Sequence, residues 1–215
     1  MKTTNMYYFE ERYWNQGYTH VVGIDEAGRG AWAGPVVVAA CILPVGYRND
    51  AIRDSKELSA NQREELAIII KRDAIDYAIV EIDAENVDTM NPKGASVFGM
   101  QKAVRLLKRA DAALIDAEKP LLEIPKLSII KGDTLSISIA AASILAKVFR
   151  DNVMTKLDDL YPNYYFAKHK GYGTKLHLQS LKKYGPLAHC HRFSYKPIKN
   201  LKHIDLFITP GKKSQ

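Results

Sequence analysis

Two apolar, β-branched runs on either side of a glycine-rich turn constrain the fold of this chain more than any other feature. The sequence there reads "VVGIDEAGRGAWAGPVVVAACIL". Each run has the length and composition of a buried strand, so we predict strands over residues 21–25 and 36–43. The first run ends in two adjacent acids, Asp25 and Glu26. Their position raises the question of what a pair of carboxylates does at the end of a core strand.

Strand-like and helix-like segments alternate along most of the remaining chain. The predicted strands are 77–82 in "YAIVEIDA", "AALIDA", closed by Asp116, and "LSIIKGD", closed by Asp133. Four helices are predicted. The first starts at about Ser59, a good N-cap, with acids in its first turn, and the second runs from Asn91-Pro92 to about Arg109. The other two cover about 134–160 and 174–184. This alternation is typical of an α/β fold with a mixed sheet.

Charge divides the chain near residue 160. Residues 161–215 contain 11 Lys and Arg but one acid, whereas the remainder contains 20 Lys and Arg and 23 acids. Six of the 12 tyrosines also lie in 161–215. We predict a core at 1–160 with a basic C-terminal helical extension, 161–215, packed on it. Basic groups interleaved with aromatic rings suit a polyanion that carries bases and sugars, and a solvated lysine-rich tail is the alternative.

The same sequence argues against a membrane or secreted protein. No apolar run reaches the roughly 18 residues of a membrane helix, and "MKTTNMYYFEERYWNQG" lacks the apolar core of a signal peptide. Two cysteines do not make a disulfide framework. We expect a soluble, cytoplasmic, monomeric protein.

Three of the predicted strands end in carboxylates, which suggests a shared site. The acids are Asp25 and Glu26 after "VVGI", Asp116 in "ALIDA" and Asp133 in "IIKGD". If the strands are neighbours, these side chains converge at one edge of the sheet. Clustered carboxylates need positive charge, and hard Mg²⁺ or Mn²⁺ ions prefer oxygen ligands. Two such ions about 3.5–4 Å apart activate water and stabilise the leaving oxygen of a phosphodiester.

Each acid also has a structural interpretation that the local sequence leaves open. Asp133 is suited to cap the helix predicted to follow it, and Asp116 is suited to a turn. Adjacent strand residues point to opposite faces, so Asp25 and Glu26 need not share a site.

The turn "GRGAWA" matches the loose dinucleotide pattern G-x-G-x-x-G/A, but we reject that interpretation. A strand is predicted where that motif requires a helix, and two carboxylates would face the pyrophosphate. Gly28 and Gly30 are better suited to a close approach to a nucleic-acid strand, with peptide groups near a ribose 2′-hydroxyl and Arg29 at a phosphate. An ordinary tight turn is the alternative.

The histidines give weak signals. His189 and His191 flank a cysteine, but no second pair stands at zinc-ligand spacing, so we do not predict zinc. His169 and His177 are expected on a polar face.

The motifs together resemble one known family. "GIDEAGRGAWAGPVVVAA", "DSKELS", "ALIDA", "GDTLSISIAAASILAKVFRD", "HKGYGT" and "GPLAHCHRFSYKPI" occur in the order seen in bacterial ribonuclease HII. The resemblance covers roughly residues 20–198. Type HIII is less similar, because its glycine motif differs. It also usually carries an N-terminal platform domain, whereas about 20 residues precede the first predicted strand here.

The resemblance implies a ribonuclease H-like fold with a five-stranded mixed sheet and a C-terminal helical extension. It also implies an endonuclease that cuts the RNA strand of RNA–DNA hybrids and nicks 5′ of single ribonucleotides in duplex DNA, as in ribonucleotide excision repair. The products carry 3′-hydroxyl and 5′-phosphate ends. The implied catalytic and metal-binding residues, for Mn²⁺ or Mg²⁺, are Asp25, Glu26, Asp116 and Asp133.

Further roles follow from the same resemblance. Gly28, Arg29 and Gly30 would read the 2′-hydroxyl and position the scissile phosphate, and Tyr172 would stack on the deoxyribose after the ribonucleotide. The implied phosphate contacts are Lys56, Ser143 and Lys147, and Asp151 resembles an additional acid near the metals.

Two other function classes remain to be separated by experiment. A non-catalytic binder of RNA–DNA hybrids would show salt-sensitive binding without cleavage. A nicotinamide-dependent oxidoreductase would bind nucleotides. The tail "LFITPGKKSQ" does not establish a tether to a replication clamp.

Overall fold

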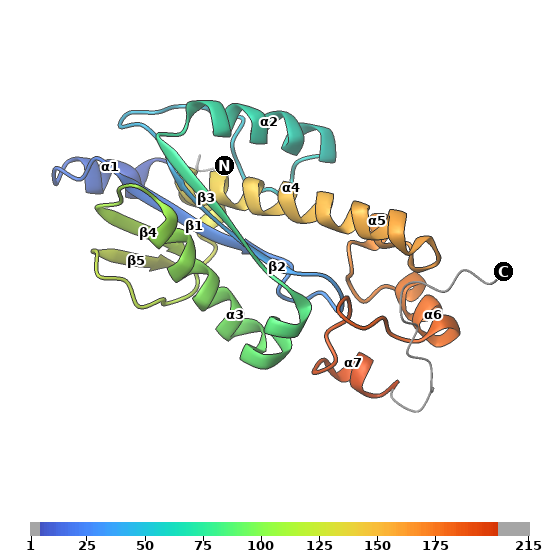
Figure 1. Ribbon diagram of the computed structural model, residues 1–215. Coiled ribbons are helices and arrows are strands. Elements are labelled where there is room, and N and C mark those ends of the chain that lie inside the picture. Colours follow the sequence, from blue (N-terminus) through green and yellow to red (C-terminus); the bar gives the residue numbers. More distant parts are fainter. Residues whose placement is uncertain (1–4, 202–215) are drawn as a thin grey trace. The chain divides into compact units, whose positions relative to one another are not determined.

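The structure is a computed structural model that describes residues 5–201 (Figure 1). The tail considered for a clamp contact lies outside the described residues. The chain divides into two compact units, each described below by itself. Unit 1 takes the described residues of Met1–Ala27, Val37–Glu81 and Ser96–Phe149, and unit 2 those of Gly28–Val36, Ile82–Ala95 and Arg150–Gln215. A core at 1–160 with an extension at 161–215 stays a prediction.

A mixed five-stranded sheet runs through unit 1, which confirms the predicted fold class. The strand order within the described chain is β3-β2-β1-β4-β5. Strand β1 is antiparallel to β2 and parallel to β4, and β4 is parallel to β5. The bounds are β1 Val21–Ala27, β2 Val36–Ile42, β3 Asp76–Ile82, β4 Ala112–Asp116 and β5 Lys126–Ile129.

Register places the acidic strand ends level with each other. In the parallel pair β1 and β4, Ile24 lies opposite Ile115. The next residues along the two strands are Asp25 and Asp116. Because parallel strands run in the same direction, both carboxylates leave the sheet at the same edge.

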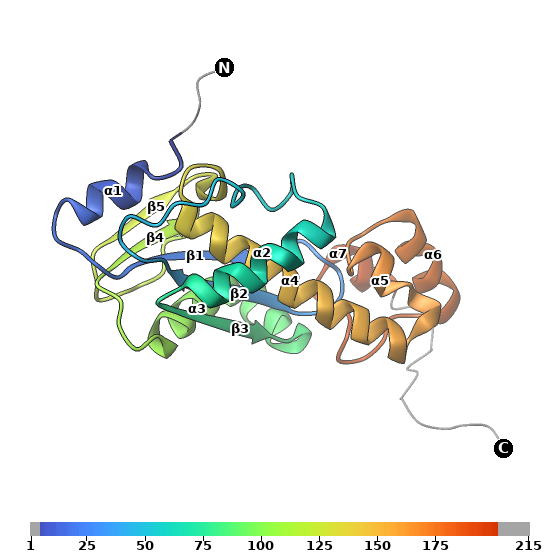
Figure 2. The ribbon, with the colours of Figure 1, turned by 90° about the horizontal axis from the view of Figure 1, so that it is seen from above.

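Helices cover both faces of this sheet in unit 1 (Figures 1 and 2). Helix α2, Ala60–Asp73, and the first half of α4, Ile137–Leu160, lie on one face, and the second half of α3, Ala84–Leu106, lies on the other. Alternate residues of β2 form a core with α2 and α4. At Gly23 of β1, a Cβ would overlap the backbone of Ser138 and Ile139, so the glycine allows α4 to pack directly on the strand.

The start signals of two helices work largely as predicted. Ser59 caps α2 through a reciprocal capping box with Gln62, although the expected acids are absent from its described first turn. Asn91, at φ 62° and ψ 162°, interrupts α3, and its Oδ1 accepts the N–H groups of Lys93 and Gly94 at 3.1 and 3.0 Å. The predicted helix after Asn91 is therefore present, but a preceding stretch from Ala84 was missed.

The start of α4 differs from the prediction. A 3₁₀ turn, η1 Gly132–Thr134, precedes the helix, which begins at Ile137. Glu10 of α1, Tyr8–Trp14, reaches this point: its Oε1 accepts the Ser136 hydroxyl at 2.5 Å and the Ser138 N–H at 3.0 Å. The carboxylate that serves the first turn of α4 is therefore Glu10, not Asp133.

Unit 2 contains short helices around a small aromatic core. They are η2 Pro162–Tyr164, α5 Phe166–His169, α6 Lys175–Tyr184 and α7 Lys196–Lys199. Thr174 caps α6 by accepting the His177 N–H at 3.2 Å, which confirms the predicted helix. The core includes Ala33, Met154, Tyr164 and Phe166. Between residues 5 and 201, no helix is long and apolar enough to cross a membrane.

Candidate active site

The predicted site residues divide between the two units. The four acids, Lys56, Ser143 and Lys147 belong to unit 1, whereas the 28–30 turn, Asp151 and Tyr172 belong to unit 2.

Asp25 lies at the centre of the acids in unit 1. It is only 5% exposed. Burial raises its pKa well above the usual range, and the charges of Glu26 and Asp116 raise it further. A hydrogen bond with Ser143 and one from the Glu26 N–H, at 2.7 Å, oppose the shift. These interactions place Asp25, Glu26 and Asp116 close enough to repel one another.

Asp133 joins this group through the turn that holds it. The Gly132 N–H donates to Asp116 Oδ1 at 2.6 Å, which ties η1 to the end of β4. The adjacent Asp133 is 4% exposed. Asp25, Glu26 and Asp116 therefore lie together where β1 and β4 end. The prediction that Asp133 closes a strand was wrong, because β5 ends at Ile129 and Asp133 reaches this edge on η1.

Lys56 supplies positive charge at the acids. Its Nζ lies 2.6 Å from Asp133 Oδ2 and 3.7 Å from Asp54 Oδ1. The hydrogen bond to Asp133 raises the pKa of Lys56, and the charges of Asp133, Asp54 and Asp25 add to this, while desolvation opposes it. The predicted phosphate contact is thus an ion pair with an acid in this structure.

The side chains fit a divalent cation by their chemistry. Among residues 5–201, no group of three or more His, Cys, Asp or Glu side chains is arranged so that it could hold a metal ion. The donors are nevertheless carboxylate oxygens, which hard cations prefer. The carboxylates of Glu26 and Asp116 repel that of Asp25, and the Lys56 ammonium binds Asp133. Positive charge is therefore stabilised at this place.

Ser143 and Lys147 lie one helical turn apart on α4. The Ser143 and Ser55 hydroxyls are 3.1 Å apart, so the "DSK" segment is attached to α4 beside Asp25. Both serines are buried. Lys147 is half-buried.

In unit 2, the glycine turn is held by a buried arginine. Gly28 has a φ of 88°, and a Cβ there would overlap the Arg150 guanidinium. Arg150 donates through Nε to Pro35 O at 2.9 Å and through Nη2 to Ala33 O at 3.1 Å. Burial lowers the pKa of Arg150 to about 10, so it remains charged at neutral pH.

A second buried arginine, Arg192, holds the same segment. Its Nε and Nη2 donate to Gly34 O at 3.0 and 2.8 Å, and its Nη1 donates to Arg29 O at 3.0 Å. The Tyr195 hydroxyl also donates to Arg29 O, at 2.5 Å. One carbonyl group within the turn and one after it are therefore fixed from inside unit 2.

Tyr172 lies on a loop that is bonded to this segment. The Gly171 carbonyl accepts the N–H groups of Trp32 and Ala33, at 2.8 and 3.3 Å. Tyr172 is 38% exposed as a residue, and the Arg150 guanidinium lies 5.3 Å from the centroid of its ring. Unit 2 thus brings together the two elements predicted to recognise the substrate.

Arg150 and Arg192 shape the site, although the sequence does not predict this role for either. Each belongs to a quoted motif, "VFRD" or "HCHRF", but a lone arginine gives no signal that it will be buried against carbonyl groups. The expected polar-face placement of His169 and His177 was wrong. Both are buried, since their rings pack on Phe166 and on each other.

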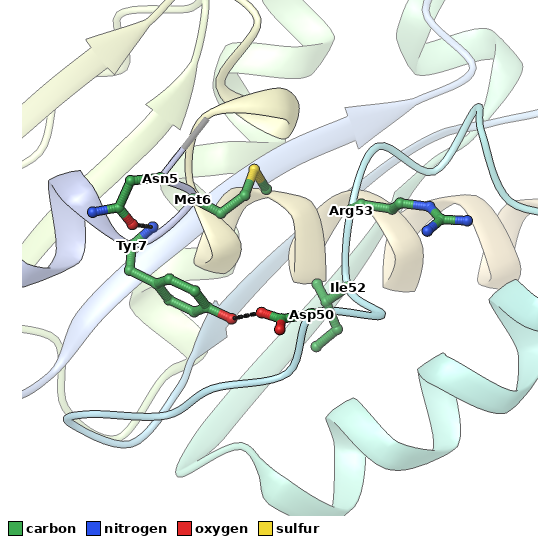
Figure 3. Close-up of a pocket in the computed structure, with 6 residues that line it drawn as sticks. All are labelled: Asn5, Met6, Tyr7, Asp50, Ile52 and Arg53. Atoms are coloured by element: carbon green, nitrogen blue, oxygen red, sulfur yellow. Dashed lines mark hydrogen bonds between the residues drawn. The ribbon is translucent and has the colours of Figure 1, made fainter. Parts of the chain in front are cut away.

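A pocket of about 240 Å³ lies elsewhere in unit 1 (Figure 3). It is lined by Asn5, Met6, Tyr7, Asp50, Ile52 and Arg53. The Tyr7 hydroxyl donates to Asp50 Oδ1 at 2.9 Å across it. None of its lining residues belongs to the predicted site.

Comparisons with known proteins agree on one family. The family model described as Ribonuclease HII matches residues 22–198. The chain is 50% identical over 191 residues to "Ribonuclease HII" of Desulfitobacterium hafniense (strain DSM 10664 / DCB-2), covering 88% of this chain and 73% of the relative. It is 48% identical over 194 residues to "Ribonuclease HII" of Myxococcus xanthus (strain DK1622), covering 89% and 66%.

Solved structures show the same fold. Ribonuclease H2 from Pyrococcus horikoshii OT3 aligns with a TM-score of 0.73 and 22% identity, covering 85% of this chain and 97% of that one. Bst-RNase HIII in complex with Mn²⁺ aligns with a TM-score of 0.61 and 17% identity, covering 86% and 70%.

Proposed function

Because the chain belongs to the ribonuclease HII family, whose activity is that of a ribonuclease H endonuclease, we propose that it nicks duplex DNA 5′ of a single embedded ribonucleotide. It also cuts the RNA strand of RNA–DNA hybrids. The products carry 3′-hydroxyl and 5′-phosphate ends.

The observation that carries this proposal is the convergence of carboxylates around Asp25. A site that binds phosphodiesters has no use for four acids unless cations lie between protein and phosphate. Asp25, Glu26, Asp116 and Asp133 would hold Mg²⁺ or Mn²⁺. When bound, these ions supply Lewis-acid activation of water and of the leaving 3′-oxygen. Mn²⁺ also accompanies a structural neighbour, Bst-RNase HIII.

The chain's own groups hold the acids in place for this role. Hydrogen bonds to the carboxylates of Asp25 and Asp116 restrict their rotamers. Lys56 partly neutralises the cluster and is mobile enough, at 76% side-chain exposure, to move from Asp133 to a substrate phosphate. Ser143 and Lys147 offer further donors from α4.

Recognition of the ribonucleotide belongs to unit 2. The turn of Gly28, Arg29 and Gly30 has a fixed backbone, because the Arg29 carbonyl accepts hydrogen bonds from Arg192 and from the Tyr195 hydroxyl. A fixed peptide group discriminates a 2′-hydroxyl from hydrogen better than a flexible one, because little order is lost on binding. Tyr172 presents a partly exposed ring for the following deoxyribose.

The test uses three labelled duplexes: all-DNA, DNA with one ribonucleotide, and an RNA–DNA hybrid. Each is incubated with Mg²⁺, Mn²⁺ or chelator. We expect a single metal-dependent nick 5′ of the ribonucleotide and no cleavage of the all-DNA duplex.

Charge-neutral variants test the assignment of the acids. Asp25→Asn and Asp133→Asn should lose at least about 10³-fold in turnover while keeping the circular dichroism of the folded protein, since the amide keeps the size of the side chain and removes the charge that would hold the metal. Asp73→Asn is the matched control, because this carboxylate pairs with an exposed arginine on α2. Wild-type turnover in either site variant would refute the metal assignment. Binding without cleavage by the wild type would favour a non-catalytic hybrid binder.

A further inference from the structure

Unit 2 contains a cluster of three buried histidines next to the Tyr172 loop. His177 is fully buried, and His169 and His191 are nearly so. The rings of His169 and His177 are stacked with centroids 4.3 Å apart. The Nε2 atoms of His177 and His191 lie 3.1 Å apart. This pair has a direct hydrogen bond, so one ring donates and the other accepts.

The proton on His191 is located by a backbone donor. The Leu187 N–H points at His191 Nδ1 at 2.9 Å. Because an N–H group can only donate, Nδ1 carries no proton, and a neutral ring must then carry it on Nε2. His191 therefore donates to His177.

The proton on His177 is located independently by an acceptor. His177 Nδ1 lies 3.0 Å from the carbonyl oxygen of Tyr172. A carbonyl can only accept, so Nδ1 carries the proton and Nε2 is bare. The two deductions agree: Leu187 N–H, His191, His177 and Tyr172 O form one chain of hydrogen bonds with a single direction.

A second proton does not fit between the two rings. Protonated His177 would place an N–H group against the N–H group of His191. Burial lowers the pKa of His177 to about 4 and that of His191 to about 3. The charge of His169 lowers the pKa of His177 further, and the charges of His177 and His169 do the same for His191. Both rings therefore remain neutral at the pH where a nuclease works.

The Tyr172 loop, at which this series of hydrogen bonds ends, is also held by contacts on its other side. The Gly171 N–H donates to His169 Nδ1 at 3.2 Å, and Gly171 O accepts from Trp32. The Trp32 ring packs 5.6 Å from the ring of His177, and a Cβ at Gly173 would overlap it. The histidine pair thus acts on the peptide that carries the Tyr172 side chain.

We propose that His191 and His177 form a proton-ordered relay that positions Tyr172 for the deoxyribose after a ribonucleotide. They are positioning residues and not catalytic ones, because they act through the Tyr172 carbonyl. This inference rests on the proposed recognition of an RNA-to-DNA junction. It assigns to the relay the preference for a junction over a continuous RNA strand.

The tautomers are the first test, and they need no variant. Long-range ¹H–¹⁵N correlation spectra of the full-length ¹⁵N-labelled protein distinguish the two neutral forms of each imidazole. We expect a proton on Nδ1 of His177 and on Nε2 of His191. His169, whose Nε2 lies 2.8 Å from Tyr164 O, serves as an internal Nε2–H reference. A proton on Nε2 of His177 would overturn the relay.

Two variants of His177 separate positioning from packing. The amide of His177→Asn lies near the position of Nδ1 and can still donate to Tyr172 O, whereas the amide of His177→Gln lies near Nε2 and cannot. We expect KM for the single-ribonucleotide duplex to rise about fivefold in the Gln variant, the effect of one hydrogen bond, with kcat retained. KM should stay within about twofold in the Asn variant. KM for the hybrid should change in neither.

Controls keep this proposal distinct from the proposed function. His189→Gln is the matched control, because this side chain is 75% exposed and bonds to Glu85. If the wild type does not nick at a single ribonucleotide, the proposed function fails. The relay fails if the wild type nicks but KM rises equally in the Asn and Gln variants. It also fails if the rise in KM is the same for the hybrid as for the single-ribonucleotide duplex. Thermal unfolding identifies a variant that does not fold, and the tautomer measurement then decides.

Discussion

Replacing Arg192 by methionine tests whether a buried arginine holds the glycine turn. The side chain is fully buried and donates to Gly34 O twice, to Arg29 O and to the Tyr195 hydroxyl. Methionine has a similar length but no donor. Arg29 O keeps its bond from Tyr195, whereas both arginine bonds to Gly34 O are lost.

The expected cost follows from these contacts. A buried carbonyl deprived of its donors costs about 1–3 kcal/mol, and lost bonds from a charged donor add a similar amount. Relief from burying a guanidinium offsets part of this, because burial lowers the pKa of Arg192 and so disfavours its charged form. We expect a net loss of about 2–4 kcal/mol in the free energy of unfolding. For a chain of this size, that lowers Tm by roughly 5–15 °C.

Equilibrium urea unfolding, followed by both fluorescence and circular dichroism, measures this loss. Arg72→Met is the control, because the Arg72 side chain is 72% exposed and pairs with its neighbour Asp73. A surface change of this kind should stay within about 0.5 kcal/mol. If Arg192→Met unfolds at the same urea concentration as Arg72→Met, the carbonyl contacts do not stabilise the turn.

Substitutions at three residues of unit 1 test the remaining predictions. Glu10→Ala should lower the free energy of unfolding by about 1–3 kcal/mol because it removes the acceptor for Ser138, with Glu10→Gln milder. Burial raises the pKa of Glu10, so the folded state binds the Glu10 proton more tightly than the unfolded state does. The free energy of unfolding of the wild type should therefore fall as the pH rises from about 4.5 through the raised pKa, whereas that of Glu10→Gln should not. Urea unfolding at several pH values measures this difference. Gly23→Ala should destabilise by about 3 kcal/mol or more, measured by thermal unfolding, because its Cβ meets helix backbone that cannot move aside. Lys56→Met should tighten Mn²⁺ binding up to about fivefold in calorimetry, since the ammonium no longer competes for Asp133, and unchanged binding would refute that competition.

Local signals determined much of the fold. The strand and helix periods, the Ser59 cap, the helix over 174–184 and the Asn91-Pro92 start could all be predicted, because each depends on residues within a few positions. The carboxylates at three strand ends were likewise predicted to converge. That inference was right for the ends of β1 and β4, because neighbouring parallel strands end at one edge and the register of Ile24 and Ile115 makes these two strands neighbours. It was wrong in placing Asp133 at a strand end, because β5 ends at Ile129 and Asp133 lies on η1.

Other features depend on residues far apart in the chain, and no local pattern encodes them. Glu10 rather than Asp133 serves the start of α4, across 128 positions from Ser138. Arg192 reaches the carbonyl of Gly34 across 158 positions.

The histidines show most clearly which properties the sequence did not predict and the tertiary structure decided. Their residue types and positions were visible, yet a polar face was expected. Only packing against Phe166, and the pairing of His177 with His191, made them buried, neutral and directional. The sequence by itself determined which groups the chain offers for catalysis and recognition. Tertiary structure decided their protonation and orientation, because both depend on desolvation and on hydrogen-bond partners that only the folded chain brings together.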